Sequence, residues 1–483
     1  MRIPLDRDEG TPLFRQVERW LRAAITDGAL AEGARLPSTR ALATELGVSR
    51  ITIATAYAEL EAAGLLTGRQ GSGSYVAATA PPPSATGPDP DHPWPLWQLD
   101  VASQPETAAS PAAGAGASRG DGVISFTGVM DLRRFPLREL ARTVTEVLRT
   151  DGMDAADYGA FDRGHAPLRR TVAELLASQG IRADPERVLI TGGSQQALAL
   201  TCGLLVRPGD AVVVEQPTYD LALELFRDLG ARVVGVPVDD DGMRVDLIEP
   251  ALQQHHPKLI YTIPNFQNPT GATLSGGRRR ELLELAARYN VAVVEDDFAG
   301  DLRYDGRAQP AIKSLDGDGH VIYLGTFSKL LLPALRVGYL VADGPILERL
   351  TARKRVHDLT TSPLLQRVVD RYVTVGRYQA QLRRSTRYCR ARRDALVAAV
   401  RRELPDATLA TPRGGLFAWL ELPDGVDTTS LLPSARARGV EYAAGARFFA
   451  DPSDGVRYAR LNFATRTPEE IDEGIARLAA AME

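Results

Sequence analysis

The sequence predicts a multidomain protein: a small helical module at the N-terminus, an α/β domain with a mostly parallel sheet, and a smaller α+β lobe at the C-terminus. A chain of 483 residues is too long for one core, since a domain takes roughly 150 residues. A Pro-, Ala-, Gly- and Ser-rich stretch divides the chain, and after it short apolar runs such as AVVVE and VAVVEDD alternate with helical patterns. The predicted parts are residues 1–76, a linker at 77–122, and residues 123–483, with the lobe starting at about residue 364.

The composition excludes several classes of protein. With 44% hydrophobic and 24% charged residues, the chain is neither disordered nor fibrous. No apolar stretch reaches the roughly 18 residues of a membrane span, and the first ten residues lack the apolar core of a secretory signal. Cys202 and Cys389 lie far apart without a metal-type spacing. We therefore expect no disulfide framework, no metal site and a cytoplasmic location.

Residues 1–76 contain three helical patterns and a final hairpin. The first helix is predicted to end at Gly28, and its apolar residues at helical spacing are Leu13, Val17, Trp20, Leu21, Ala24 and Ile25. Ser38 caps a second helix that stops at Gly47, and Ser49 caps a third, RITIATAYAELEAAG. The apolar side of this third helix is expected to hold Ile51, Ala54, Tyr57, Ala58 and Leu60. The segment LLTGRQGSGSYV predicts two strands around a glycine-rich turn.

The order of these elements indicates DNA binding. Two short helices joined by LGVS have the spacing of a helix-turn-helix, and the two strands after them form a wing. The segments RLPSTRALATELGVSRITIATAYAELEAAGLL and RQGSGSYV resemble the winged helix-turn-helix of the GntR regulator family. The expected partner is double-stranded operator DNA. The expected contacts are Arg50, Thr52 and Thr55 at base edges, Arg35, Ser38, Thr39, Arg40 and Ser49 at phosphates, and Arg69 and Gln70 in a minor groove.

The alternative for this module is binding to another protein. Residues 1–76 hold nine arginines and nine acidic residues, which gives that alternative some support. Between Arg35 and Val76, however, four arginines face three glutamates, and the arginines fall where phosphates would lie. We therefore favour DNA binding.

The linker carries runs such as PPPSATGPDPDHPWPLW, which bury too little apolar surface to offset the entropy of ordering. Three apolar side chains interrupt it: Trp94, Leu96 and Trp97. These side chains either dock the linker onto a domain or make only local apolar contacts.

Lysine usage points to the chemistry of the large domain. Of 57 basic residues only four are lysines, namely Lys258, Lys313, Lys329 and Lys354. Lys329 lies in GTFSKLLLPALRVGY, on a loop after a predicted strand, where its amine can form a Schiff base with pyridoxal 5'-phosphate. Thr326, Ser328 and Arg336 are close in sequence and suit the cofactor phosphate. The alternative is an ordinary surface lysine.

Further segments supply groups for the same cofactor. VLITGGSQQALAL predicts a strand, a glycine turn and a helix whose free amides attract a phosphate. The residues at that helix N-terminus are Gly193, Ser194 and Gln195. Asn268 follows a strand and can donate to the phenolic oxygen, and Asp296 ends another strand and can bind the pyridine nitrogen. Tyr219 can stack on the ring. Each alone is ordinary strand-end chemistry, but together they predict a pyridoxal phosphate site.

The part after the linker resembles fold type I aminotransferases, and the whole chain resembles a MocR-type regulator, a GntR protein with an aminotransferase-like domain. The resemblance implies Lys329 as the Schiff-base lysine, Asp296 at the pyridine nitrogen and Tyr219 over the ring. It implies Arg460, in YARLNFA, as the clamp for an effector carboxylate. It also implies a homodimer in which Tyr158 reaches the phosphate in the neighbouring subunit's site.

Two positions bear on catalysis. The family places a tyrosine shortly after the strand-end aspartate, where it bonds the phenolic oxygen, and this chain has Phe298. Loss of that donor raises the pKa of the internal aldimine and argues against efficient transamination. Asn268, in contrast, is the aminotransferase asparagine that many such regulators replace.

Three functions fit these motifs. The leading one is a transcription regulator that binds pyridoxal 5'-phosphate and senses a small amine or amino acid, or the cofactor itself, through aldimine exchange. The second is an active aminotransferase with an accessory DNA-binding module. The third is a regulator whose large domain has lost the cofactor and only dimerises.

Overall fold

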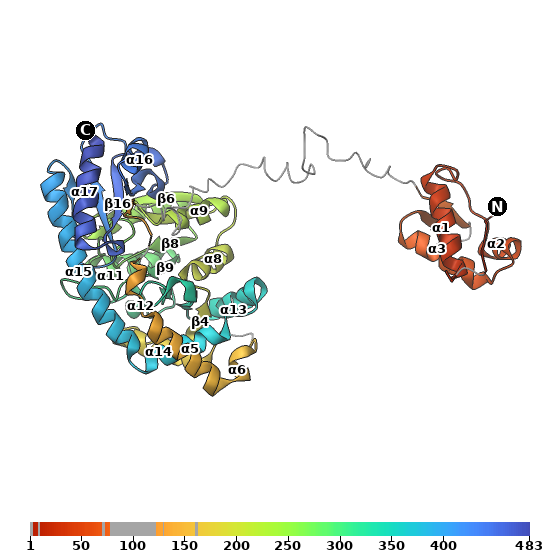
Figure 1. The fold of residues 1–483 in the computed structure, drawn as a ribbon, viewed down its shortest axis with the longest axis horizontal. Coiled ribbons are helices and arrows are strands. Elements are labelled where there is room, and N and C mark those ends of the chain that lie inside the picture. The colour runs from red at the N-terminus through yellow and green to blue at the C-terminus, as the bar shows by residue number, and fades with distance from the viewer. Residues whose placement is uncertain (1–2, 8–9, 70–72, 78–121, 129, 160–162) are drawn as a thin grey trace. The chain divides into compact units, whose positions relative to one another are not determined.

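The computed structural model describes residues 3–7, 10–69, 73–77, 122–128, 130–159 and 163–483. Contacts divide the chain into two compact units, residues 1–104 and 105–483 (Figure 1). The predicted linker, with Trp94, Leu96 and Trp97, lies outside the described residues except for its two ends. Among the helices of the described ranges, none is both long enough and apolar enough to cross a membrane.

The N-terminal unit consists of three helices and a hairpin. They are α1 (Leu13–Thr26), α2 (Thr39–Leu46), α3 (Arg50–Ala62), β1 (Leu66–Arg69) and the antiparallel β2 (Gly73–Val76). Both predicted N-caps are present, because Ser38 Oγ accepts from the Ala41 amide at 3.2 Å and Ser49 Oγ accepts from the Thr52 amide at 3.1 Å. The α2 helix ends at Gly47, which adopts a left-handed φ of 64°.

The apolar side predicted for α3 is correct at Tyr57 and Leu60 and wrong at Ile51, Ala54 and Ala58. The buried residues of this helix are Ile53, Ala56, Tyr57 and Leu60. Ile51 is 77% exposed, and Ala54 and Ala58 are exposed as well. Alanines lie on both sides of the helix, so apolar spacing alone could not distinguish the side that faces the core. The side that carries Ile51 faces solvent.

The large sheet of the second unit has eight strands in the order β4-β11-β10-β9-β8-β5-β6-β7. In chain order their bounds are β4 (Val188–Thr191), β5 (Ala211–Gln216), β6 (Arg232–Asp239), β7 (Gly242–Met243), β8 (Leu259–Thr262), β9 (Ala292–Asp297), β10 (Val321–Thr326) and β11 (Gly338–Val341). The pairs from β10 through β9, β8 and β5 to β6 are parallel, while β11 and β7 are antiparallel to their neighbours. The predicted mostly parallel sheet is therefore confirmed.

Helices cover both faces of this sheet (Figure 1). Val212 and Val214 of β5 pack in one hydrophobic cluster and Val213 in another, which is typical of a parallel sheet buried on both sides. The helices of this part are α5 (Leu137–Asp151), α6 (Met153–Ala156), α7 (Ala166–Ser178), α8 (Ser194–Leu205), α9 (Asp220–Asp228), α10 (Ile248–His255), α11 (Gly276–Tyr289), α12 (Ile312–Leu315) and α13 (Pro345–Asp358).

The C-terminal lobe is built on a four-stranded antiparallel sheet in the order β12-β13-β16-β15. Its elements are α15 (Arg377–Glu403), β12 (Thr408–Leu409), β13 (Phe417–Glu421), α16 (Thr428–Ala437), β14 (Val440–Glu441), β15 (Ala443–Ala444), β16 (Tyr458–Asn462) and α17 (Pro468–Met482). Helices α15 and α17 lie side by side along it (Figure 1).

Two features of the lobe involve other parts of the chain. The strand β3 (Ile124–Ser125), directly after the linker, pairs in parallel with β14. The predicted start of the lobe near residue 364 falls in α14 (Pro363–Thr374), which packs against α5 and α7 as well as α15. The beginning and the end of the large unit therefore meet in the lobe.

Candidate functional site

The carboxyl ends of five strands meet at one edge of the large sheet, because β4, β5, β8, β9 and β10 run in the same direction. Open α/β sheets bind ligands at this edge. A cavity of about 190 Å³ lies there. It is lined by Gly128, Ser194, Tyr219, Asp220, Leu221, Ile263, Asn268, Asp296, Phe298, Lys329, Phe417, Arg447 and Arg460.

Lys329 differs from the other three lysines. Each of those has a carboxylate within 4 Å: Lys258 with Asp210 at 3.9 Å, Lys313 with Asp316 at 2.9 Å, and Lys354 with Asp358 at 2.9 Å. Lys329 has no ion pair with any described residue, and burial lowers its pKa to about 8, although the Asp296 carboxylate acts in the opposite direction. Its amine can therefore lose its proton near neutral pH and act as a nucleophile.

Asp296 is the residue before the last of β9, and its carboxylate has one oxygen bonded and the other free. The Tyr261 hydroxyl donates to Asp296 Oδ2 at 2.9 Å, while Oδ1 is buried without a hydrogen-bond partner among the described residues. Burial raises the pKa of Asp296 to about 6, and the bond from Tyr261 acts against this. A protonated pyridine nitrogen at Oδ1 would supply the missing donor and a compensating charge. Tyr261 was not among the predicted site residues.

The groups predicted to hold the phosphate lie next to one another. Arg336 Nη2 donates to the carbonyl of Gly192 at 2.9 Å. A Cβ on Gly193 would lie 2.6 Å from the same nitrogen, so only glycine allows this approach, and its φ of 105° also favours glycine. Ser194 begins α8, and Ser328 Oγ is buried without a hydrogen-bond partner in the described ranges. A phosphate fits this set, since it accepts hydrogen bonds from amides, hydroxyls and a guanidinium.

Of the residues predicted to bind the phosphate, only Ser194 lines the cavity itself. Thr326 Oγ1 accepts from the Ser328 amide at 3.1 Å, and Thr326 lines a second, smaller cavity behind Phe298. Gln195 is the second residue of α8 and is half-buried.

Arg460, on β16 of the lobe, reaches into the cavity and contacts the large sheet domain. Its Nη1 donates to Asn268 Oδ1 at 2.8 Å, which leaves the amide nitrogen of Asn268 as a donor. The guanidinium carbon lies 4.3 Å from the ring centroid of Phe417 and 4.8 Å from that of Phe448. Arg460 Nε is buried without a hydrogen-bond partner among the described residues. Burial lowers the pKa of Arg460 to about 10, so the side chain stays cationic at neutral pH and lacks an anion.

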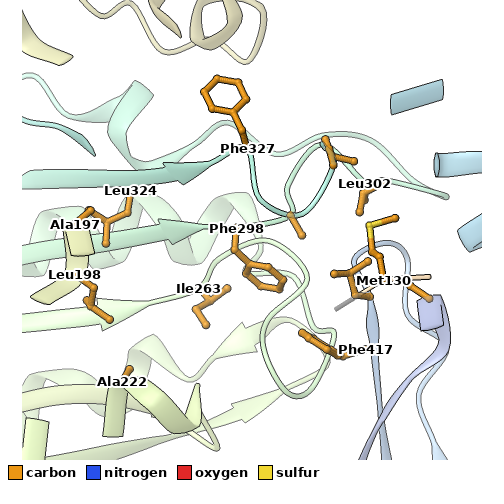
Figure 2. Close-up of a cluster of buried hydrophobic side chains, with 14 of the residues drawn as sticks. Met130, Ala197, Leu198, Ala222, Ile263, Phe298, Leu302, Leu324, Phe327 and Phe417 are labelled. Atoms are coloured by element: carbon orange, nitrogen blue, oxygen red, sulfur yellow. The ribbon is translucent and has the colours of Figure 1, made fainter. Parts of the chain in front are cut away.

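Aromatic side chains form the walls of the cavity. Phe298 and Phe417 approach each other with ring centroids 5.9 Å apart, close to Ile263 (Figure 2). Lys329 Nζ lies 6.0 Å from the Phe298 ring centroid. Phe298 thus presents carbon where the family tyrosine would present a hydroxyl. Tyr219 lines the same cavity, and burial raises the pKa of its hydroxyl, which stays protonated.

Glu215, inside β5, fixes the loop that carries Asn268. Its carboxylate accepts from Thr262 Oγ1 at 2.7 Å, from the Ile263 amide at 3.1 Å and from Gln267 Nε2 at 3.1 Å. Burial raises the pKa of Glu215 to about 7. The sequence held a signal for it, since an acidic residue inside the apolar run AVVVE needs internal partners.

Three arginines of the N-terminal unit lie on its surface, as DNA binding requires. Arg35, Arg40 and Arg50 are exposed, and the Arg35 guanidinium lies beside Gly73 at the start of β2. The hydroxyl of Thr52 is 2.8 Å from Ser49 Oγ, so both side chains already serve the N-terminus of α3.

The remaining predicted DNA contacts are less well placed by the structure. Thr39 and Thr55 are half-buried. Gln70 lies outside the described residues, and of Arg69 only the backbone is described.

Tyr158 does not line the cavity of its own chain. It lies on the loop after α6 and is 64% exposed. Its predicted role in the neighbouring subunit's site stays a prediction.

Comparison with known proteins identifies both units. The family model "Bacterial regulatory proteins, gntR family" matches residues 13–76, and "Aminotransferase class I and II" matches residues 128–478. Over nearly its full length the chain is similar to the probable rhizopine catabolism regulatory protein MocR of Rhizobium meliloti, with 33% identity over 99% of this chain and 95% of that protein. This chain is a MocR-type regulator of the GntR family. The predicted family and fold class are confirmed.

The large unit of this MocR-type regulator is also similar to enzymes. It is 40% identical to aromatic-amino-acid aminotransferase 1 of Thermococcus litoralis, over 75% of this chain and 88% of that protein. The crystal structure of Pyrococcus horikoshii kynurenine aminotransferase is 38% identical with a TM-score of 0.72, over 75% of this chain and 91% of that chain. The regulator therefore carries a complete aminotransferase fold.

Proposed function

We propose that this MocR-type regulator binds pyridoxal 5'-phosphate at Lys329 and uses the site to sense a small amine or amino acid. Binding of that effector changes how the protein binds operator DNA in the cytoplasm. The observation that carries the proposal is the contrast among the four lysines. Only Lys329 forms no ion pair with a described residue, and it lines a cavity together with Asp296, which has a free carboxylate oxygen.

The cofactor, when bound, supplies an electrophilic carbonyl that condenses with primary amines. Lys329 holds it covalently, and its lowered pKa keeps part of the amine neutral for that purpose. Asp296 Oδ1 holds the proton on the pyridine nitrogen. Arg336, Ser194 and Ser328 bind the phosphate and fix the ring position.

Arg460 makes the site a sensor for carboxylates. Its guanidinium lacks an anionic partner among the described residues, and a planar guanidinium binds a carboxylate through two parallel hydrogen bonds. Because Arg460 belongs to the lobe and Asn268 to the large sheet domain, a ligand that binds Arg460 changes the contact between the two. A ligand shifts such an equilibrium by its differential affinity for the two arrangements.

An active aminotransferase is the second candidate. It is favoured by Asn268, which this chain retains, and by the 40% identity to an aromatic-amino-acid aminotransferase. Phe298 argues against it, because carbon replaces a hydroxyl donor beside Lys329. We therefore propose that any turnover is slow and that the effector persists as a signal.

The test uses full-length protein and the DNA upstream of its own gene in a mobility-shift titration. Operator affinity is compared for cofactor-free protein, for cofactor-loaded protein, and for loaded protein with a panel of amines and amino acids. We expect at least one panel member to change both the absorption of the bound cofactor and operator affinity. If only the cofactor itself changes DNA binding, the sensed signal is the cofactor. If neither the cofactor nor any panel member changes operator affinity, the proposed sensor function is wrong.

A further inference from the structure

A buried ion pair lies in the cavity and has no part in the cofactor site described above. Asp220 begins α9, directly after Tyr219, and Arg447 lies in the 3-10 turn Gly445–Phe448 of the lobe. Arg447 Nη2 is 2.7 Å from Asp220 Oδ2, with the two side chains 14% and 8% exposed. Both residues line the cavity that Lys329 and Arg460 also line.

Stability alone is a weak reason for this pair. Removing two charges from water costs as much as their attraction returns, and apolar replacements of buried pairs are often neutral or stabilising. Arg447 Nε is, in addition, buried without a hydrogen-bond partner in the described part of the chain. Leu221 and Ile263, which line the same cavity, are apolar. Uncharged side chains could therefore line the cavity in place of this ion pair.

The charges that face a ligand add to one positive charge. Lys329 and Asp296 serve the cofactor, which leaves Arg460 and Arg447 as cations and Asp220 as the anion. Burial lowers the pKa of both Lys329 and Arg460, and the charge of Asp220 acts against this at both groups. The Asp220 carboxylate is therefore within electrostatic reach of the two groups that would bind amine and carboxylate. In a cavity with apolar walls, such charges act strongly because water screens them little.

We propose that the Asp220–Arg447 pair is a charge filter that restricts the effector to amines with one carboxylate and an otherwise uncharged body. A second carboxylate on the ligand would find no free cation at Arg447, because Asp220 already neutralises it. A second ammonium group would meet Asp220 already neutralised by Arg447. The inference rests on the proposed sensing function and names the chemical class of its effector.

The test is a spectroscopic titration of cofactor-loaded, full-length protein with matched ligands. L-Glutamine and L-glutamate differ by one carboxylate, and L-norleucine and L-lysine differ by one ammonium group. We expect wild-type protein to bind each neutral ligand at least tenfold more tightly than its charged match. Equal affinities within each match would overturn the inference and leave the sensing function intact, whereas no response to any amine overturns both.

Two variants then shift the selectivity in opposite directions. Asp220→Asn frees Arg447, so the glutamate-to-glutamine affinity ratio should rise at least tenfold. Arg447→Met frees Asp220, so the lysine-to-norleucine ratio should rise instead. The double variant has no charge at either position, so it should favour neither glutamate nor lysine. It also serves as a reference where a single variant is unstable. The control is Glu249→Gln, which removes a carboxylate from an exposed pair with Arg288 on α10 and α11 and should leave both ratios unchanged. Ratios that do not move in either single variant contradict the charge filter.

Discussion

Arg460 donates a hydrogen bond to Asn268 across 2.8 Å, and this bond joins the C-terminal lobe to the large sheet domain. Arg460 lies on β16, opposite Trp419 of β13, and Asn268 lies on the loop after β8. In the proposed function Arg460 therefore binds the effector carboxylate while it also contacts Asn268, which is proposed to bind the cofactor. A ligand that engages Arg460 can act on both at once.

Arg460→Ala should abolish the response of operator binding to a carboxylate ligand and keep the basal affinity for DNA. In the proposed function the guanidinium binds the carboxylate, whereas Lys329, Asp296 and Arg336 would hold the cofactor. Absorption of the bound cofactor and a mobility-shift titration with and without ligand measure both properties. Arg457 directly precedes the same strand and pairs with Glu421 and Asp424, so Arg457→Ala should behave as wild type. An intact ligand response in Arg460→Ala would contradict the assignment.

Lys329→Ala should eliminate covalent attachment of pyridoxal 5'-phosphate without unfolding the protein. Mass spectrometry after borohydride reduction detects the attachment, and thermal unfolding reports the fold. Lys258→Ala is the matched control, since Lys258 is half-exposed and pairs with Asp210 at 3.9 Å. Reduced cofactor on another lysine of Lys329→Ala would show that the site is assigned to the wrong residue.

Asp296→Asn should change the pH dependence of the cofactor-free protein. Burial raises the pKa of Asp296 from 3.8 to about 6. A raised carboxyl pKa stabilises the folded state fully below about pH 4, and this stability is lost as the pH rises through about 6. Two pKa units correspond to about 3 kcal/mol. Between pH 4 and 7 the unfolding free energy of the variant should therefore fall less than that of wild type, by up to this amount.

Urea unfolding at pH 4, 5, 6 and 7 measures this difference. Glu215 and Glu295 are also buried with raised pKa values, but burial is the largest cause for both and is the same in the two proteins, so most of their contribution cancels in the comparison. Parallel pH profiles for the two proteins would mean that Asp296 is not a buried, uncompensated carboxyl. The same variant should bind the cofactor more weakly, because it cannot neutralise a protonated pyridine nitrogen.

Arg50→Ala should weaken specific operator binding by about 1–3 kcal/mol if Arg50 reads a guanine edge in the major groove. Arg50 is exposed at the start of α3, so its loss should not affect stability. Arg22→Ala on α1 is a suitable control, since Arg22 is engaged by Glu18 at 2.7 Å. Mobility-shift titrations on operator and on unrelated DNA separate specific from general effects. Equal operator affinity of Arg50→Ala and wild type would remove Arg50 from the base contacts.

Ile51 and Ile53 should respond in opposite ways to replacement by alanine. Ile53 is fully buried, and its truncation should lower the unfolding free energy of the N-terminal unit by about 2–5 kcal/mol. Ile51 is 77% exposed, and its truncation should change stability by less than about 0.5 kcal/mol. Chemical denaturation followed by circular dichroism compares them. If both variants lost a comparable unfolding free energy, Ile51 would face the core of the unit, as the sequence predicted.

Local signals in the sequence predicted much of the fold and part of the site. A few neighbouring residues are enough to predict the caps Ser38 and Ser49. They are also enough to predict the strand ends that bring Asp296 and Lys329 to one cavity. The orientation of α3 was not predictable in this way, because its alanines give both sides an apolar spacing.

Contacts between distant segments could not be predicted from these patterns. The pairing of β3 with β14 and the ion pair of Asp220 with Arg447 join parts of the chain far apart in sequence. Arg447 stands in an ordinary-looking turn, GARFF, and nothing near it in sequence indicates a partner. Such residues enter the site only when the lobe packs on the large sheet domain.

The most direct test of the sensing function measures DNA affinity and turnover on the same sample. Wild-type protein loaded with cofactor is titrated with its best spectroscopic ligand, and operator affinity and product formation with a keto acid are recorded together. We expect a clear change in operator affinity with turnover far below that of a dedicated aminotransferase. Turnover at ordinary enzyme rates, with operator affinity unchanged by the ligand, would contradict it and establish the large unit as a working enzyme.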